Sequence, residues 1–379
     1  KITATRAMPE FVGTVLKWWH GHAVGRWGLR TTQEVIDEIT DNPVLAAAFA
    51  AQWFDHGGRP SKGSFAIHAL ITGSYLESGA WYPKGGGGAL AEHIIPTITK
   101  AGGEARTDTK VETLLLKDDR VIGVRTAQGE EIYADTVITG IGARETVNSL
   151  LPADCRHQEW IDEINALPHS VAHFSLFVGF EGDIERAGAT RSNHWIYPDG
   201  KVDVVWTDAP DSPPPALFVS FASLKDPAHD PGPTQKHAGE IVTWVDWSVV
   251  EKWADKAPGQ RGEDYRTFKV QVENKMFALF EAYFPDLAKL VVLRNLSTPL
   301  TTQAITGHHK GAFYGIDTTP DRLMSEALQT RTPIPGLYLA GQDVLTPGIP
   351  GALWGGILAA ATVDPKLFRQ LPSLSLIHI

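Results

Sequence analysis

The chain has 379 residues, of which 43% are hydrophobic and 21% charged, an ordinary composition for a globular protein. Its formal net charge of −10 argues against a nucleic-acid partner, because nucleic acids bind basic surfaces. The single cysteine, Cys155, excludes a disulfide framework, a paired-cysteine redox motif and a cysteine zinc site. This length predicts one large domain or two intertwined ones.

We expect neither a membrane span nor a signal peptide from this sequence. No apolar run reaches the roughly 18 residues of a membrane span, and the residues after Lys1 lack the apolar core of a signal peptide. We therefore expect a cytoplasmic or peripherally membrane-associated protein. The chain does not begin with methionine, so we interpret it as a fragment, and we interpret residues 367–379 as a tail of non-native origin.

Residues 1–80 are predicted to be helical. Thr31-Thr32 suits an N-cap for a helix over residues 34–39. Residues 43–54 are alanine-rich and apolar on most sides, which predicts a buried helix. Residues 65–72 form another apolar helix candidate.

From residue 81 the pattern alternates between helix and strand. A glycine loop at residues 85–88 leads into a helix that continues to Ala101 and contains Pro96. Three strands are then predicted within residues 105–116, 121–126 and 131–135, separated by turns at Asp118-Asp119 and Gln128-Gly129-Glu130. A fourth, apolar strand over residues 136–143 runs into glycines.

Residues 151–330 read as a mixed region. Strands are predicted at residues 175–180 and 217–223, and a helix at residues 268–284 that ends before Pro285.

The stretch from Gly336 to Gly356 is the most informative one. Residues 337–340 are predicted to form a buried parallel strand, which ends at Gly341-Gln342-Asp343. A glycine-rich loop and a helix that begins near Gly351 follow. Free N–H groups at a helix start favour an anionic or polar ligand, and glycines let it approach the backbone.

These motifs resemble the carotenoid-desaturase-like FAD oxidoreductases, and within them the all-trans-retinol saturase branch. The resemblance is carried by Tyr-Pro-Lys-Gly-Gly at residues 82–86, the strands after it, Gly-x-x-Tyr-Gly at residues 311–315 and Ala-Gly-Gln-Asp at residues 340–343. It implies an α/β fold. An FAD/NAD(P)-binding Rossmann-like domain of the amine-oxidase or glutathione-reductase type would be interleaved with an α+β substrate lobe.

The resemblance also implies domain bounds. Residues 1–80 would be substrate-domain helices and residues 81–150 the middle part of the FAD-binding domain. Residues 151–330 would form the substrate domain, and residues 331–366 the C-terminal part of the FAD-binding domain.

The same resemblance implies the site residues. Asp343 or Gln342 would bind the ribityl chain of FAD, and Gly351 and Ala352 would approach the flavin ring. The backbone of Val111 would contact the adenine. The turn with Gly140 and Gly142 would pass the pyrophosphate, and Gly341 and Gly348 belong to the C-terminal motif.

One part of the family pattern is missing from residues 1–80. A flavin enzyme of this class opens with a strand, Gly-x-Gly-x-x-Gly and a helix. No such unit occurs there. We therefore expect an N-terminally truncated dinucleotide-binding domain.

Other constellations have weaker interpretations. His20-Gly-His22 and His308-His309 lack partners at ligand spacing, so no metal is predicted. Tryptophans in the regions assigned to the substrate lobe suit either a large apolar cavity or ordinary core packing. They are Trp18, Trp19, Trp53, Trp195, Trp206, Trp244 and Trp247.

The leading functional prediction is an FAD-dependent oxidoreductase acting on a carbon–carbon bond of an apolar polyene or isoprenoid, with hydride passing through flavin N5. The resemblance implies NAD(P)H as electron donor. The alternatives are a flavin amine oxidase and a non-catalytic lipid-binding or inactive fragment. An apolar substrate favours peripheral membrane contact, with helices of residues 40–75 as candidates. No catalytic residue and no oligomeric state is predicted.

Overall fold

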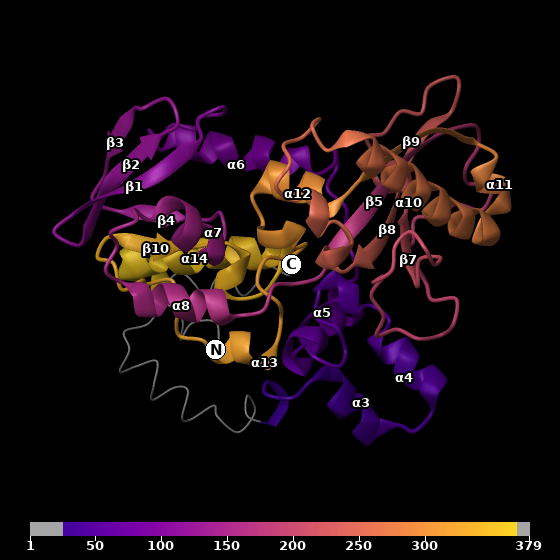
Figure 1. Ribbon diagram of the computed structural model, residues 1–379, viewed down its shortest axis with the longest axis horizontal. Coiled ribbons are helices and arrows are strands. Elements are labelled where there is room, and N and C mark those ends of the chain that lie inside the picture. The colour runs from indigo at the N-terminus through magenta and orange to yellow at the C-terminus, as the bar shows by residue number, and fades with distance from the viewer. Residues whose placement is uncertain (1–25, 370–379) are drawn as a thin grey trace. The chain divides into compact units, whose positions relative to one another are not determined.

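The computed structural model describes residues 26–369. The predictions made for residues 1–25, including His20, His22, Trp18 and Trp19, lie outside this part, as does the tail beyond residue 369. The described chain divides into two compact units. Unit 1 comprises residues 26–79, 108–170 and 312–369, and unit 2 comprises residues 80–107 and 171–311. Figure 1 shows their elements.

These bounds differ from the expected domains. The helices before residue 80 cluster with residues 108–170, and residues 80–107 cluster with residues 171–311. Which unit binds flavin and which binds substrate stays a prediction, because the division into units does not test it.

Unit 1 combines two small sheets with helices. Its helices are α3 (Thr32–Ile39), α4 (Pro43–Ala50), η1 (Trp53–Asp55), α5 (Phe65–Ser78), α7 (Ala143–Glu145), the π-helix η2 (Thr146–Leu150), α8 (Gln158–Ala166), α13 (Pro320–Met324), η6 (Gln342–Val344), α14 (Gly348–Val363) and η7 (Pro365–Arg369). Strands β1 (Val111–Lys117), β2 (Arg120–Thr126) and β3 (Glu131–Tyr133) form an antiparallel sheet, and β4 (Val137–Thr139) pairs in parallel with β10 (Leu337–Leu339).

The predicted strands of unit 1 are confirmed, with corrections of their bounds. The turn at Asp118-Asp119 has two positive φ angles, as a tight two-residue hairpin turn requires. The strand predicted from residue 105 begins only at Val111, as β1. The strand predicted over residues 136–143 is β4, which ends at Thr139, and Ala143 already begins α7. Buried residues of β10, such as Leu337 and Leu339, join the apolar core of this unit, which also contains Leu358 of α14.

Unit 2 is built on a five-stranded sheet. Its strands β5 (Ala172–Glu181), β6 (His194–Ile196), β7 (Leu217–Ser220), β8 (Lys236–Val245) and β9 (Val291–Ser297) lie in the order β6-β7-β8-β5-β9. Its helices are α6 (Gly88–Lys100), α9 (Ala222–Lys225), η3 (Trp247–Val249), η4 (Glu251–Trp253), α10 (Gly262–Tyr283), α11 (Pro285–Ala288), α12 (Pro299–Thr306) and η5 (His309–Gly311). The predicted strand over residues 217–223 is too long, because the chain turns into α9 at Ala222.

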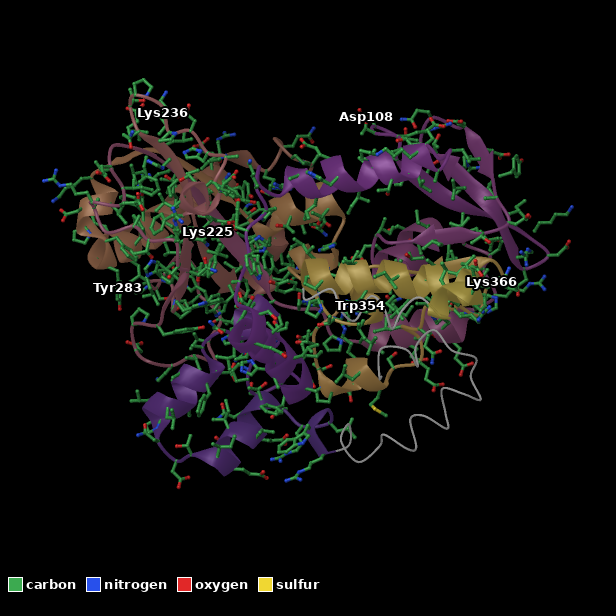
Figure 2. All side chains as sticks on the ribbon, turned by 180° about the vertical axis from the view of Figure 1, so that it is seen from behind. Asp108, Lys225, Lys236, Tyr283, Trp354 and Lys366 are labelled. Atoms are coloured by element: carbon green, nitrogen blue, oxygen red, sulfur yellow. The ribbon has the colours of Figure 1, made fainter. Side chains whose placement is uncertain are left out.

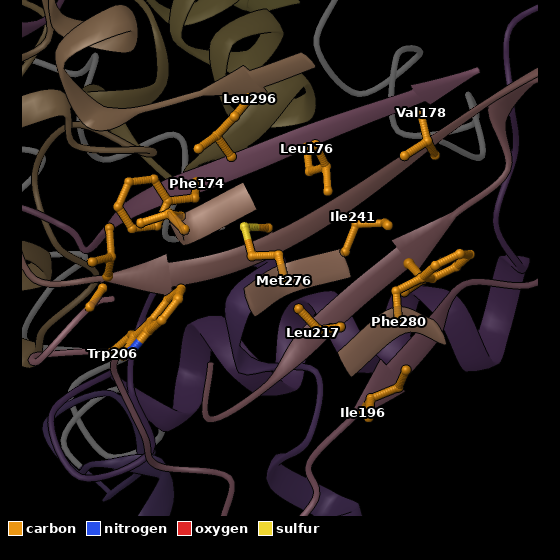
Figure 3. Close-up of a cluster of buried hydrophobic side chains, with 14 of the residues drawn as sticks. Phe174, Leu176, Val178, Ile196, Trp206, Leu217, Ile241, Met276, Phe280 and Leu296 are labelled. Atoms are coloured by element: carbon orange, nitrogen blue, oxygen red, sulfur yellow. The ribbon is translucent and has the colours of Figure 1, made fainter. Parts of the chain in front are cut away.

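Helix α10 and one face of this sheet form the core of unit 2. Buried α10 residues Phe268, Val272, Met276 and Phe280 recur every four residues, so they lie on one side of the helix. Figure 3 shows Met276 and Phe280 beside Leu176 and Ile241 of the sheet. Burying each such side chain stabilises the fold by about 1.5–3 kcal/mol.

The first helices show what local sequence determines. The prediction of an N-cap at Thr31-Thr32 is confirmed, since Thr31 caps α3 in a capping box with Glu34. The helix predicted from residue 43 is present, but the prediction that it is buried is wrong. Helix α4 forms, but Val44 is 77% exposed and only Ala50 is buried. Apolar composition does not determine what covers a helix.

No helix among residues 26–369 is long and apolar enough to cross a membrane.

A buried histidine pair connects η1, α4 and α5. His56 Nε2 lies 3.0 Å from His68 Nδ1, and His68 Nε2 lies 2.9 Å from the Phe49 carbonyl oxygen. The Gly58 N–H donates to His56 Nδ1. Because a carbonyl only accepts and an amide N–H only donates, each imidazole carries one proton, on Nε2. Burial lowers the pKa of His56 to about 3 and also lowers that of His68.

This pair predicts acid sensitivity. His56 is protonated in the unfolded chain below about pH 6.5 but stays neutral in the fold, so its stabilising contribution is complete above that pH and is lost as the pH falls toward 3. We expect His56→Asn to reduce the slope of unfolding free energy against pH by about 1.4 kcal/mol per pH unit between about pH 6 and pH 4. Urea unfolding across this range measures the slope. The exposed His93→Asn is the control, and an unchanged slope in His56→Asn contradicts the neutral pair.

Candidate functional site

The candidate site lies where the parallel strands β4 and β10 end. Val137 pairs with Leu337 and Thr139 with Leu339, so both strands reach their carboxyl ends together. Gly140 follows β4 directly, and Gly341 follows β10 after Ala340. In open α/β sheets, ligands bind at the carboxyl ends of such strands.

Asp343 joins three segments of unit 1 at this edge. Its carboxylate is 2% exposed. Oδ2 accepts from the Ala143 N–H at 2.8 Å, and Oδ1 accepts from the Ile316 N–H at 3.3 Å. The turn after β4, the segment after Tyr314 and the turn after β10 therefore meet on one carboxylate.

Two buried arginines accompany Asp343. Arg322 of α13 has no exposed surface and donates to the carbonyl oxygens of Ile316 and Gln342. Burial lowers the pKa of the Arg322 guanidinium, while the charges of Asp343 and Asp317 oppose this. Arg144 is 6% exposed, donates to the Leu167 carbonyl oxygen and also lies in the field of Asp343.

The loop from Asp343 into α14 is fixed by close packing. Gln342 Oε1 accepts from the Gly348 N–H at 3.0 Å. A Cβ atom on Gly355 would lie 2.1 Å from the Gly341 carbonyl oxygen, and one on Gly351 would lie 1.5 Å from that of Thr346. Only glycine permits these approaches, so α14 packs directly on the turn. The helix begins at Gly348, three residues before the predicted start.

The structure brings most of the predicted site residues together. They are Gly140, Gly142, Gly341, Gln342, Asp343, Gly348, Gly351 and Ala352, all in the two turns or on α14. Val111 begins the antiparallel strand β1, where it pairs with Thr126 of β2, and it packs against the apolar core that contains Leu337 and Leu339. Its contact with adenine stays a prediction.

The arrangement fits the polar chain of a flavin. The Thr346 hydroxyl is buried and has no hydrogen-bond partner among the described residues. A Cβ atom added to Gly140 would have no atom of the described residues within 4 Å apart from those of its chain neighbours, so the space beside this glycine is open. Ala352, on the first turns of α14, is exposed. The Asp343 oxygens keep lone pairs beyond the two N–H groups that they bind. A hydroxyl-bearing ligand finds both acceptors and a hydroxyl partner here.

Sequence reasoning missed Arg322, Arg144, Ala143 and Ile316. Ile316 directly follows the Gly-x-x-Tyr-Gly segment, which was its nearest signal. Arg322 had none, because a single arginine after a proline resembles a surface helix residue. Its burial depends on segments distant in sequence.

The charge cluster makes a stability prediction. Asp343→Asn removes a negative charge that acts on both Arg322 and Arg144, and it weakens the acceptor of the Ala143 and Ile316 N–H groups. Asp317 and Glu145 remain near the two arginines, so we expect a loss of about 2 kcal/mol in unfolding free energy. Guanidinium unfolding measures it. Asp321→Asn is the matched control, since this exposed carboxylate precedes Arg322 in α13. Equal stability of the two variants contradicts the role of Asp343.

Known proteins are similar to this chain in sequence. All-trans-retinol 13,14-reductase of Danio rerio is 31% identical over 89% of this chain and 58% of its own length. Phytoene desaturase (lycopene-forming) of Pseudescherichia vulneris is 25% identical over 90% of this chain and 66% of its own. The chain thus spans about three fifths of the retinol reductase that it matches.

Solved structures agree. The structure of an oxidoreductase from Methanosarcina mazei superposes with a TM-score of 0.60 at 12% identity, over 95% of this chain and 74% of the other. That of cyclohexylamine oxidase from Brevibacterium oxydans superposes with a TM-score of 0.52 at 14% identity, over 92% of this chain and 69% of the other, which confirms the predicted amine-oxidase type of α/β fold. The sequence profile described as flavin containing amine oxidoreductase matches residues 32–244, more than half of the chain. The chain therefore belongs to the flavin-containing amine oxidoreductase family.

Proposed function

We propose that the protein is a flavin-dependent oxidoreductase that acts on carbon–carbon double bonds of an apolar polyene. The observation that carries the proposal is the site at the ends of β4 and β10, in a chain that matches a retinol reductase over 89% of its length. FAD is the proposed cofactor, and reduction with NAD(P)H as electron donor is the proposed direction.

The residues of unit 1 would hold the cofactor. Asp343 and the Thr346 hydroxyl supply an acceptor and a hydroxyl to the ribityl chain. Arg322 keeps the Gln342 carbonyl, and with it the Asp343 turn, in place. When bound, a flavin supplies hydride transfer, and the protein supplies orientation and a dry environment.

The test is a pair of absorption spectra followed by an assay. The chain is purified alone and with a Gly-x-Gly-x-x-Gly βαβ segment added upstream, incubated with FAD and gel-filtered. We expect flavin bands to be retained, at least by the extended protein, and all-trans-retinol to be reduced in the presence of NADPH. Asp343→Ala should lose the bands, while Asp321→Ala keeps them.

The outcomes separate the alternatives. Hydrogen peroxide released with amines but not with polyenes favours an amine oxidase, which the family name makes the second candidate. Polyene binding without flavin in either protein favours a lipid-binding role. No flavin and no polyene binding contradicts the proposal.

We also propose peripheral membrane contact through the exposed apolar residues of α4 and α5. Val44 is 77% exposed and Leu76 is 86% exposed. Such side chains insert into the interfacial layer of a bilayer.

The variant Val44→Glu/Leu76→Glu should therefore sediment several-fold less with phosphatidylcholine vesicles than the unmodified chain does, because charged side chains resist insertion. Ile305→Glu, which changes an apolar residue of α12 that is 78% exposed, is the control. Equal sedimentation of all three proteins contradicts membrane contact through α4 and α5.

A further inference from the structure

The five-stranded sheet of unit 2 has a second face, opposite to the face that packs on α10. Side chains alternate between the faces along each strand. Phe174, Leu176 and Val178 of β5 belong to the core, so Ser175 and Phe177 lie on the second face. Glu240 of β8 is paired with Phe177 of β5 and with Ser220 of β7, which places it on the second face too.

A polar cluster crosses the middle of this second face. Ser175, which is 3% exposed, is the diagonal neighbour of Glu240 across the β5–β8 pairing, because Ser175 pairs with Val242 and Phe177 with Glu240. Lys225, labelled in Figure 2, donates to Ser220 Oγ at 2.7 Å and to Asn193 Oδ1. Burial raises the pKa of Glu240, and the Ser175 hydroxyl and the charge of Lys225 oppose this.

Aromatic rings lie beside the cluster. Trp195 of β6 pairs with Phe218 of β7, with ring centroids 4.9 Å apart, and Trp195 lies 6.3 Å from Trp244. Phe218 pairs with Val242, which in turn pairs with Ser175. One row across the strands therefore runs from the indole of Trp195 to the hydroxyl of Ser175. Phe177, next to Glu240, is 46% exposed.

We propose that Ser175 and Glu240 bind the hydroxyl end group of a polyene alcohol whose apolar chain lies along Trp195, Phe218 and Phe177. This inference rests on the proposed function and names the end group of its substrate. A hydroxyl both donates and accepts, so it matches a carboxyl and a serine together. A hydrocarbon end group would displace water from Glu240 and Ser175 and could not replace the hydrogen bonds that these side chains make to water. The Lys225 ammonium already supplies a positive charge beside Glu240, which opposes the binding of a second cation to this carboxyl.

Binding to the full chain tests the inference without a need for flavin. Three probes are titrated: all-trans-retinol, the same polyene with hydrogen in place of the hydroxyl, and the same polyene with a primary amine. Quenching of tryptophan fluorescence is the signal, because polyene absorption overlaps indole emission. Trp195→Phe should reduce the quenching amplitude and so locates the probe on this face.

The variants separate the end group from the chain. In Glu240→Leu we expect Kd for the alcohol to rise about tenfold and Kd for the hydrocarbon to stay unchanged. Glu240→Gln, which keeps hydrogen-bonding capacity, should lie between the two. Ser175→Ala should weaken alcohol binding as well. Glu181→Leu is the matched control, because Glu181 is an exposed carboxylate on the neighbouring strand β5.

The failures are distinguishable. Equal affinity for alcohol and hydrocarbon, unchanged by Glu240→Leu, overturns the inference and leaves polyene binding intact. Tighter binding of the amine also overturns it. No quenching by any of the three polyenes contradicts the proposed function and the inference together.

Discussion

The arrangement of the turns in unit 1 depends on the hydrogen bonds and the charge of the buried Asp343 carboxylate. This carboxylate accepts from the N–H groups of Ala143 and Ile316. Its charge, together with those of Asp317 and Glu145, offsets the burial of Arg322 and Arg144. An isolated buried charge of either sign costs several kcal/mol, so these groups stabilise one another only as a set. Their shared geometry fixes the two turns that form the candidate flavin site.

Unit 2 uses its sheet in two different ways. One face is apolar and packs on α10, as the four-residue spacing from Phe268 to Phe280 requires. The other carries Glu240 and Ser175 beside tryptophan and phenylalanine rings. Because alternate residues of one strand serve the two faces, core stability and ligand selectivity can change independently by substitution on the same strands.

Local signals determined what sequence could predict. The capping box at Thr31 and Glu34, the turn at Asp118-Asp119 and the strand over residues 337–339 each depend on neighbouring residues. The predicted cluster around Asp343 came from a family resemblance, and the structure brings its turns together. Whether Val44 is exposed and Arg322 buried depends on which distant segments of the chain pack against them. Local composition does not determine that packing.

The interleaving of the two units has a consequence for synthesis on the ribosome. Ala143 and Asp343, which share a hydrogen bond, are 200 positions apart in the chain. Strand β4 is therefore translated long before β10, its parallel partner, emerges. Contacts of such long range slow folding, and an unpaired strand is prone to aggregation in the meantime. Strand β4 of a nascent chain therefore stays without its parallel partner until residues 337–339 have been made.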